Sequence, residues 1–276
     1  MSARIGINGF GRIGRDYLRY LLAAQDTDLE VVAINDVTDS ATMARLLRYD
    51  STFGPLRRDV EDLGDAIGVD GHRIAVSAER DPALVTWRDH GVEIVIESTG
   101  KFRTREAAAA HLGAGVSKVL LSSPGKGIDA TIVMGVNDNT YDQSQHHIIS
   151  NASCTTNCVA PMVKVLLRLD GVALRVPVVD GSLVDLAVLL ERDVTAAEVN
   201  AAFEAAGATG PLAGRLRCTT DPVVSSDVIG DSASCVFDSE LTWASGRFVK
   251  VFGWYDNEWG YTARLVDLTR LVAAQG

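Results

Sequence analysis

The first half of the chain alternates short apolar runs with stretches of helical periodicity, and this alternation limits the fold more than any other feature. Parallel strands need a crossover connection, and a helix usually supplies it, so alternating strands and helices are typical of a parallel sheet. The pattern predicts a doubly wound parallel (Rossmann) sheet of the α/β class. The predicted strands are Arg4–Asn8, Glu30–Asn35, His72–Val76, Glu93–Glu97, Lys118–Leu121, Thr131–Val136 and His147–Ser150.

After Ser153 the apolar runs become longer and partly alternating, which is typical of a mixed or antiparallel sheet with helices on one face. We therefore expect a second α+β domain with a mixed sheet. It begins with the helical pattern from Cys154 to Leu169. The strands predicted to follow are Arg175–Val179, Leu183–Leu190, Val223–Ser226, Cys235–Phe237, Leu241–Trp243 and Phe248–Trp254.

Two further helices have clear sequence signals. Thr195 and Glu198 have the spacing of a capping box at the start of Ala196–Ala206, and Gly207 is expected to end that helix. In the last residues, Tyr261–Ala274, apolar side chains also recur at helical spacing. The predicted division is a first domain over residues 1–151, completed by a C-terminal helix over 259–276, and a second domain over 152–258.

Composition and charge exclude several classes of function. With 47% hydrophobic residues among 276, the chain can bury a substantial core. Thirty-six acidic and 26 basic side chains give a net charge of −10, which disfavours nucleic acid or an anionic membrane as the main partner. No apolar run approaches the roughly 18–20 residues of a spanning helix, and the amino terminus has no signal-peptide core. We therefore expect a cytoplasmic protein.

The run Gly9-Phe10-Gly11-Arg12-Ile13-Gly14 follows the first predicted strand and opens a predicted helix. Glycine lets the backbone approach a pyrophosphate, and the first N–H groups of a helix face its charge. Asp36 ends the second predicted strand, where a carboxylate accepts hydrogen bonds from the adenosine ribose and repels a 2′-phosphate. The pattern predicts NAD as cofactor, in preference to NADP. A glycine turn required only for packing is the less favoured alternative.

The four cysteines are too few for a disulfide scaffold and lack paired metal-ligand spacing, so no metal site is expected. Cys154 falls where a predicted strand ends and a helix begins. A thiol there feels the positive end of the helix dipole, which favours the reactive thiolate. Cys158, one turn further along, is expected to be buried. From the residues alone, Cys154 could equally be a nucleophile or a structural thiol.

Six short words of the sequence together resemble phosphorylating glyceraldehyde-3-phosphate dehydrogenase of the bacterial NAD-dependent type. They are INGFGRIGR at Ile7–Arg15, IND at Ile34–Asp36, ESTGKF at Glu97–Phe102, SNASCTTNC at Ser150–Cys158, RVP at Arg175–Pro177 and WYDNEWGY at Trp254–Tyr261. The resemblance implies a glycolytic oxidoreductase whose cysteine thiolate attacks an aldehyde. Hydride then passes to the nicotinamide, and phosphate cleaves the resulting thioester to give an acyl phosphate.

The resemblance also implies roles for single residues. Cys154 matches the nucleophile, Ser153 and Thr155 match its phosphate-binding neighbours, and Arg175 matches the arginine of the substrate-phosphate pocket. Asn257 matches the asparagine that orients the nicotinamide amide. The other positions that match cofactor contacts are Gly9, Gly11, Arg12, Ile13, Gly14, Asp36, Arg80, Thr99, Phe102 and Ser122. The expected partners are a small phosphorylated aldehyde, inorganic phosphate and further copies of the chain, which form a tetramer in the family.

One stretch departs from the family pattern. Val163–Gly171 runs straight into Val172–Arg175, where the family has a strand with the catalytic histidine, a long loop and another helix. A segment of about fifty residues is therefore expected to be absent from the second domain. It would hold the histidine base, a second set of phosphate-binding threonines and a loop that reaches the cofactor and the subunit interface. A natural loss, an engineered deletion and an omitted stretch would all produce this pattern.

No histidine in the sequence replaces the missing base. All five precede Cys154, and His147 is separated from it by seven residues, or roughly 20 Å of extended strand. We therefore expect impaired catalysis. Two alternatives are a non-catalytic NAD-binding or regulatory paralogue and an enzyme like erythrose-4-phosphate dehydrogenase.

Overall fold

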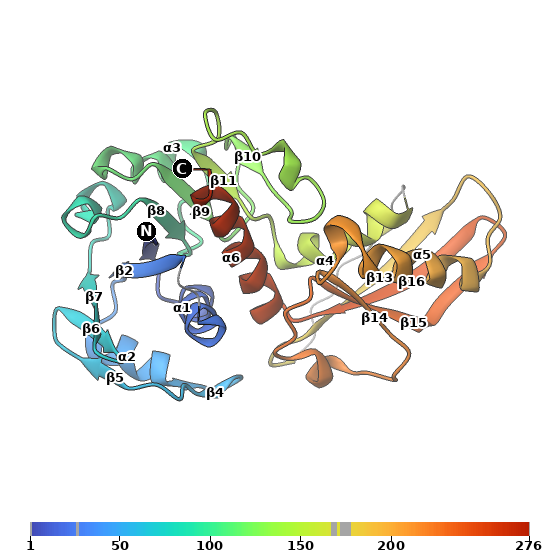
Figure 1. The fold of residues 1–276 in the computed structure, drawn as a ribbon, viewed down its shortest axis with the longest axis horizontal. Coiled ribbons are helices and arrows are strands. Elements are labelled where there is room, and N and C mark those ends of the chain that lie inside the picture. The colour runs from blue at the N-terminus through green and yellow to red at the C-terminus, as the bar shows by residue number, and fades with distance from the viewer. Residues whose placement is uncertain (1, 26–27, 167–169, 172–177, 276) are drawn as a thin grey trace. The chain divides into compact units, whose positions relative to one another are not determined.

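The computed structural model describes residues 2–25, 28–166, 170–171 and 178–275, and it divides into two compact units. The first unit consists of Met1–Ile132, Thr140–Ala152 and Leu265–Gly276, and the second of Val133–Asn139 and Ser153–Arg264. Figure 1 labels the elements along the chain. Each unit contains its own sheet, and the cores are described separately below.

The first unit is built on a sheet whose order, among the described residues, is β10-β11-β9-β8-β1-β2-β7-β6-β5. The first seven strands in that order pair in parallel, and the last two pair antiparallel. The central strands are buried on both faces, which explains why they read as continuous apolar runs. Their bounds are β1 Ala3–Asn8, β2 Leu29–Asn35, β5 Val60–Asp62, β6 Ala66–Val69, β7 His72–Ser77, β8 Ile94–Glu97, β9 Lys118–Leu121, β10 Ala130–Thr131 and β11 Ile148–Ser150.

Short helices connect these strands. Helix α1 buries Tyr17, Leu18 and Leu21, and the Asp39 side chain caps α2 by accepting the Thr42 N–H. The α-helices are α1 Arg12–Ala24, α2 Ser40–Arg48 and α3 Arg105–Ala109, with a two-stranded ribbon of β3 Tyr49–Asp50 and β4 Gly54–Pro55. The 3₁₀ helices are η1 Pro82–Leu84, η2 Trp87–His90 and η3 Leu112–Ala114, and η4 Asp138–Thr140 lies where the chain returns from the second unit.

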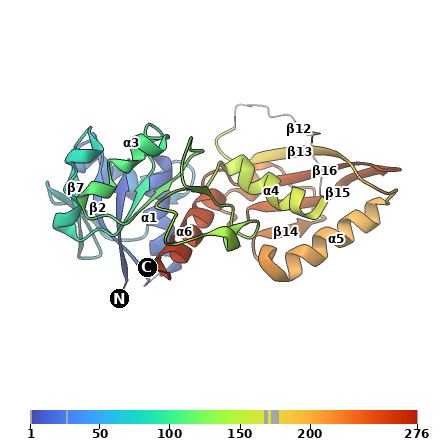
Figure 2. The same ribbon diagram turned by 90° about the horizontal axis from the view of Figure 1, so that it is seen from above.

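The second unit has a mixed sheet of order β12-β13-β16-β15-β14, in which β14 pairs in parallel with β15 and the other pairs are antiparallel. Helices α4 and α5 pack on this sheet (Figure 2). The rings of Phe203 on α5 and Phe237 on β15 are stacked in the core between helix and sheet, with their centroids 3.8 Å apart. The bounds are α4 Cys154–Leu166, β12 Asp170–Gly171, β13 Ser182–Leu189, α5 Ala196–Ala208, η5 Gly210–Leu212, β14 Leu216–Thr219, η6 Ser225–Val228, β15 Cys235–Ser245 and β16 Phe248–Tyr255. Helix α6, Trp259–Ala273, starts in this unit, and its residues from Leu265 on belong to the first.

Strands β13 and β16 alternate between buried and exposed side chains, so one face of this sheet meets the helices and the other faces solvent. The exposed side chains include Leu189, Trp243 and Phe248. Lys250 and Asp185 form an ion pair at 3.0 Å between the two strands.

The predicted fold class, a doubly wound parallel sheet with a second domain built on a mixed sheet, is confirmed. Several details of the prediction are wrong, and the two strands expected over Cys235–Phe237 and Leu241–Trp243 are a single strand, β15. The strand expected over Thr131–Val136 ends at Thr131, and the one expected over Val223–Ser226 is irregular chain leading into η6. The capping box at Thr195 is present, but α5 continues through Gly207 to Ala208.

No helix in the described part of the chain is both long and apolar enough to cross a bilayer.

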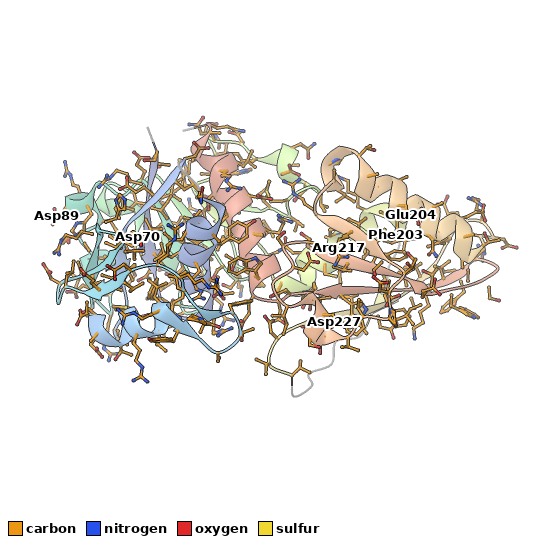
Figure 3. All side chains as sticks on the ribbon, turned by 60° about the horizontal axis from the view of Figure 1, so that its bottom comes forward. Asp70, Asp89, Phe203, Glu204, Arg217 and Asp227 are labelled. Carbon is orange, nitrogen blue, oxygen red and sulfur yellow. The ribbon has the colours of Figure 1, made fainter. Side chains whose placement is uncertain are left out.

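The Phe203–Phe237 stack gives a stability prediction for the second unit. Because Phe203 is fully buried, Phe203→Ala should lower the free energy of unfolding by about 3–5 kcal/mol, measured by urea denaturation. Its neighbour Glu204 is exposed, so Glu204→Ala should change stability by less than about 0.5 kcal/mol (Figure 3). Equal losses in the two variants would contradict this account of the core.

Candidate functional site

The glycine loop between β1 and α1 is shaped by close backbone packing. Gly9 has φ +93°, and a Cβ there would lie 2.7 Å from the Thr99 nitrogen. A Cβ on Gly14 would lie 2.2 Å from the Gly9 oxygen. A Cβ on Gly11 would instead meet nothing within 4 Å, and Gly11 is exposed. The loop therefore packs tightly against the protein and leaves open space at Gly11.

The amino terminus of α1 faces this open space without a side-chain cap. Gly11 occupies the N-cap position, and the first turn holds no acidic residue. The positive end of a helix with these features attracts an anion. This end of the helix can therefore receive a pyrophosphate.

Asp36 is fixed beside the loop by two backbone hydrogen bonds. Its Oδ2 accepts the Phe10 N–H at 2.6 Å, and its Oδ1 accepts the Thr38 N–H at 2.9 Å. Each carboxylate oxygen can accept a further hydrogen bond, because it has two lone pairs. The open space at Gly11, the uncapped helix and the acceptor at Asp36 together fit NAD.

The other predicted cofactor residues of the first unit lie at strand ends or in the loops that follow. Thr99 and Ser122 follow the parallel strands β8 and β9, and the Ser122 N–H donates to the backbone carbonyl oxygen of Glu97 at 3.0 Å. Phe102 is half-buried, and Arg80 is exposed in the loop after β7. Ile13, in the first turn of α1, is half-buried.

The Arg12 side chain is engaged within the protein. Its guanidinium donates to Asp50 at 2.9 Å and to Thr52 at 3.0 Å. Burial alone would raise the pKa of Asp50, but N–H groups of Phe53 and Thr52 and the charge of Arg12 lower it overall. With the side chain committed to Asp50, the backbone is the part of Arg12 that remains for a cofactor.

Cys154 begins α4 in the second unit and is partly exposed. Ser153, just before it, accepts the Thr156 N–H at 3.0 Å and shares a hydrogen bond with the Thr156 hydroxyl at 2.8 Å. Ser153 thus caps the helix that carries Cys154. Ala152, with φ +57°, adopts a left-handed conformation uncommon for residues other than glycine and places a sharp bend two residues before the thiol.

The other cysteines have environments that suppress thiolate formation or access. Burial raises the pKa of Cys158 well above its usual range, and its Sγ donates to the Gly253 oxygen at 3.7 Å. Burial also raises the pKa of Cys218, to about 11, and Cys235 is fully buried. Cys154 is therefore the cysteine best placed to react.

Four side chains around Cys154 and β16 are linked in pairs. The hydroxyls of Thr155 and Tyr255 share a hydrogen bond at 2.9 Å, and Ser182 donates to the Asn257 Oδ1 at 2.8 Å. This hydrogen bond from Ser182 fixes the orientation of the Asn257 side-chain amide. Sequence patterns did not single out Ser182 or Tyr255, although Tyr255 lies within the word WYDNEWGY.

Arg175 lies outside the described residues, as do residues 175–177 of the predicted strand Arg175–Val179, and Val178 and Val179 do not belong to a strand. No histidine of the sequence belongs to the second unit, because all five fall within the first. Among the described residues, no group of three or more His, Cys, Asp or Glu side chains could hold a metal ion.

Two buried carboxylates face each other next to Asn257. Asp256 accepts N–H groups from Gly230, Glu258 and Trp259, whereas Asp180 accepts only the Gly181 N–H among the hydrogen bonds of the described residues. Burial and the charge of Asp256, followed by that of Glu258, raise the pKa of Asp180 to about 7. Burial and the neighbouring carboxylates therefore favour the protonated form of Asp180.

Comparisons with known proteins show the family to which the chain belongs. Residues 3–105 match the family profile described as "Glyceraldehyde 3-phosphate dehydrogenase, NAD binding domain", and residues 167–257 match "Glyceraldehyde 3-phosphate dehydrogenase, C-terminal domain". Glyceraldehyde-3-phosphate dehydrogenase of Streptomyces coelicolor is 48% identical over 336 residues, and that of Geobacillus stearothermophilus is 42% identical over 337 residues. Both alignments cover all of this chain and all of the relative.

The fold and these similarities define an NAD-dependent oxidoreductase. The chain belongs to the glyceraldehyde-3-phosphate dehydrogenase family. The alignment with the Streptomyces coelicolor protein is 336 positions long, so, with 276 residues in this chain, 60 positions have no counterpart in it.

The neighbouring carboxyl groups of Asp180 and Asp256 make the free energy of unfolding depend on pH. Between pH 4 and 7 the unfolded Asp180 is ionised while the folded Asp180 keeps its proton, so the free energy of unfolding falls as pH rises through this window. Asp180→Asn removes this effect and should stabilise the chain by up to about 4 kcal/mol at pH 8, and by less at pH 5. Urea denaturation at both values measures the difference.

The control is Asp185→Asn, which neutralises an exposed carboxylate of the same unit. It should show no comparable gain at pH 8. A stability change in Asp180→Asn that is the same at pH 5 and pH 8 would contradict the assignment of the proton.

Proposed function

We propose that the chain oxidises glyceraldehyde 3-phosphate with NAD and inorganic phosphate to an acyl phosphate, through a thioester on Cys154. The observation that carries the proposal is the partly exposed Cys154 in the first turn of α4, in a chain that aligns over its whole length with glyceraldehyde-3-phosphate dehydrogenases. The substrate is taken from the names of these relatives.

The proposed division of labour follows the domain boundaries expected from the sequence. Residues 1–151, completed by 259–276, bind NAD through Gly9, Gly11, Gly14, Asp36 and the backbone of Arg12 and Ile13. Residues 152–258 hold the substrate. Arg80, Thr99, Phe102 and Ser122 are proposed as further cofactor contacts, and Ser153, Thr155 and Arg175 as phosphate contacts.

Cys154 performs the covalent chemistry. Its sulfur, at the start of α4, attacks the aldehyde carbon. Bound NAD supplies the acceptor for the hydride that leaves this carbon. Asn257, oriented by Ser182, is proposed to donate its amide N–H to the nicotinamide carboxamide. Phosphate then attacks the thioester carbon, and the bond to Cys154 breaks.

The second unit offers no histidine to remove the thiol proton, so we propose that catalysis is impaired. Loss of a positioned acid–base group costs about 10²–10⁴ in rate. This observation also favours a second candidate, a non-catalytic or regulatory NAD-binding protein. A homo-oligomer stays a prediction from the resemblance, and a cytoplasmic location stays a prediction from the absence of long apolar runs in the sequence.

The proposal predicts slow formation of NADH from glyceraldehyde 3-phosphate, NAD and phosphate, measured by absorbance. The rate should be at least about a hundredfold below that of the Streptomyces coelicolor relative, because a positioned acid–base group is missing. Cys154→Ser should abolish it, and Cys218→Ser should leave it intact. Turnover equal to the relative's would refute the impairment.

Other results of this assay separate the alternatives. NAD binding without NADH formation would support the non-catalytic protein, and a faster reaction with erythrose 4-phosphate would support the related dehydrogenase.

Asp36 gives a separate prediction about cofactor choice. A 2′-phosphate placed at the ribose would meet the uncompensated carboxylate, so NAD should bind more tightly than NADP. Asp36→Ala should weaken the binding of NAD and narrow the preference for NAD over NADP, as measured by fluorescence titration with each cofactor. Asp39→Ala, on the neighbouring exposed N-cap, is the matched control and should leave the preference unchanged. Tighter binding of NADP by the unmodified chain would overturn the role of Asp36.

A further inference from the structure

A chain of buried polar side chains runs beneath the glycine loop of the first unit. It contains Asn8, Asn35, Glu97 and His111, each at most 4% exposed. Buried polar groups destabilise a fold unless they are hydrogen-bonded, and apolar residues of similar volume are often at least as stabilising. A network of this kind is therefore better explained by the geometry it imposes than by its contribution to stability.

Trp87 fixes the tautomer of His111. The fully buried Trp87 donates its indole N–H to the His111 Nδ1 at 3.1 Å. An imidazole that accepts at Nδ1 carries its proton on Nε2. That Nε2 lies 3.2 Å from the Glu97 Oε2, so His111 donates a hydrogen bond to the Glu97 carboxylate.

Glu97 receives donors on both oxygens. Oε2 accepts the Asn8 amide at 2.6 Å in addition to His111, and Oε1 accepts both the N–H, at 2.9 Å, and the hydroxyl of Thr99. The carboxylate is thus saturated within the protein and is not available to a ligand. Its effect is to hold Asn8 and Thr99, which lie at or just after the ends of β1 and β8.

These two residues adjoin the glycine loop. A Cβ on Gly9 would lie 2.7 Å from the nitrogen of Thr99, so the segment after β8 packs directly against the loop. Ser98, between Glu97 and Thr99, donates its hydroxyl to the Gly9 oxygen at 2.6 Å. A rotation of Glu97 would therefore change the position of the loop.

This network of side-chain hydrogen bonds continues to two more strands. Asn8 accepts the Asn35 amide at 2.8 Å, and the Asn35 Oδ1 accepts the Ser77 hydroxyl at 2.9 Å and the Glu79 N–H at 2.8 Å. Side-chain hydrogen bonds thus connect the ends of β8, β1, β2 and β7, the four adjacent strands that carry the predicted cofactor edge.

We propose that His111, with its tautomer fixed by Trp87, is a positioning residue for NAD and acts through Glu97 on Thr99 and the glycine loop. The inference rests on the proposed placement of NAD at this edge. His111 itself touches no cofactor, because it is fully buried and both ring nitrogens are used within the protein.

The first experiment compares His111→Leu with His111→Gln by NAD titration. Leucine fills space but leaves the Glu97 carboxylate without one buried donor, so the Kd for NAD should rise about tenfold. Glutamine retains an N–H donor and should keep the Kd within about threefold of the unmodified value. Val119→Ala, in the same core, controls for general destabilisation and should leave the Kd unchanged. Equal Kd values for the leucine variant and the unmodified chain would overturn the proposal.

The second experiment observes the tautomer without cofactor. In the unmodified chain labelled with ¹⁵N-histidine, the signals absent from His111→Gln identify His111, and they should have the shifts of the Nε2–H form. Trp87→Phe removes the donor to Nδ1 and should introduce the Nδ1–H form. An Nδ1–H tautomer in the unmodified chain would overturn the proposal. Failure of the unmodified chain to bind NAD would instead overturn the proposed function, since the spectrum does not depend on NAD.

Discussion

The parallel arrangement of β1, β2 and β8 decides where the first unit can place polar side chains. These strands are buried on both faces, so polar groups gather where the strands end. Asn8, Asn35 and Glu97 occupy those ends and satisfy one another's buried atoms. The glycine loop begins at the same edge, and its close contact with Thr99 makes its shape depend on the polar side chains beneath it.

The sequence predicted features whose partners are close along the chain or follow from strand order. Gly9, Gly14 and Asp36 were recognisable because the glycine spacing, the helix and the next strand follow in a fixed order, and the Phe10 N–H joins the loop to Asp36. Helix α4 begins at Cys154, where the predicted strand-to-helix change falls. The alternation in the first half was sufficient to predict the parallel sheet.

Features that depend on distant residues had no such signal. The hydrogen bonds of His111 join it to Glu97, 14 positions away, and to Trp87, 24 positions away. Asp180 and Asp256 meet only once β13 and β16 have paired. The apolar run after Thr131 resembled a strand, but Val133 bonds to Asn137 in a local turn and leaves the sheet. In each case tertiary contacts, which local patterns do not encode, determine the outcome.

The first unit is assembled from separate chain segments, and this affects how the protein folds during its synthesis. Leu265–Gly276 belongs to this unit, although the whole of Ser153–Arg264 is synthesised before it. At typical ribosome speeds, residues 1–152 wait on the order of ten seconds for the segment that completes their core. Val266 and Leu268 are fully buried in the finished protein, so the apolar surface they cover is exposed during that interval. Nascent chains of this protein should therefore depend on chaperones more than chains whose first folding unit is continuous in sequence.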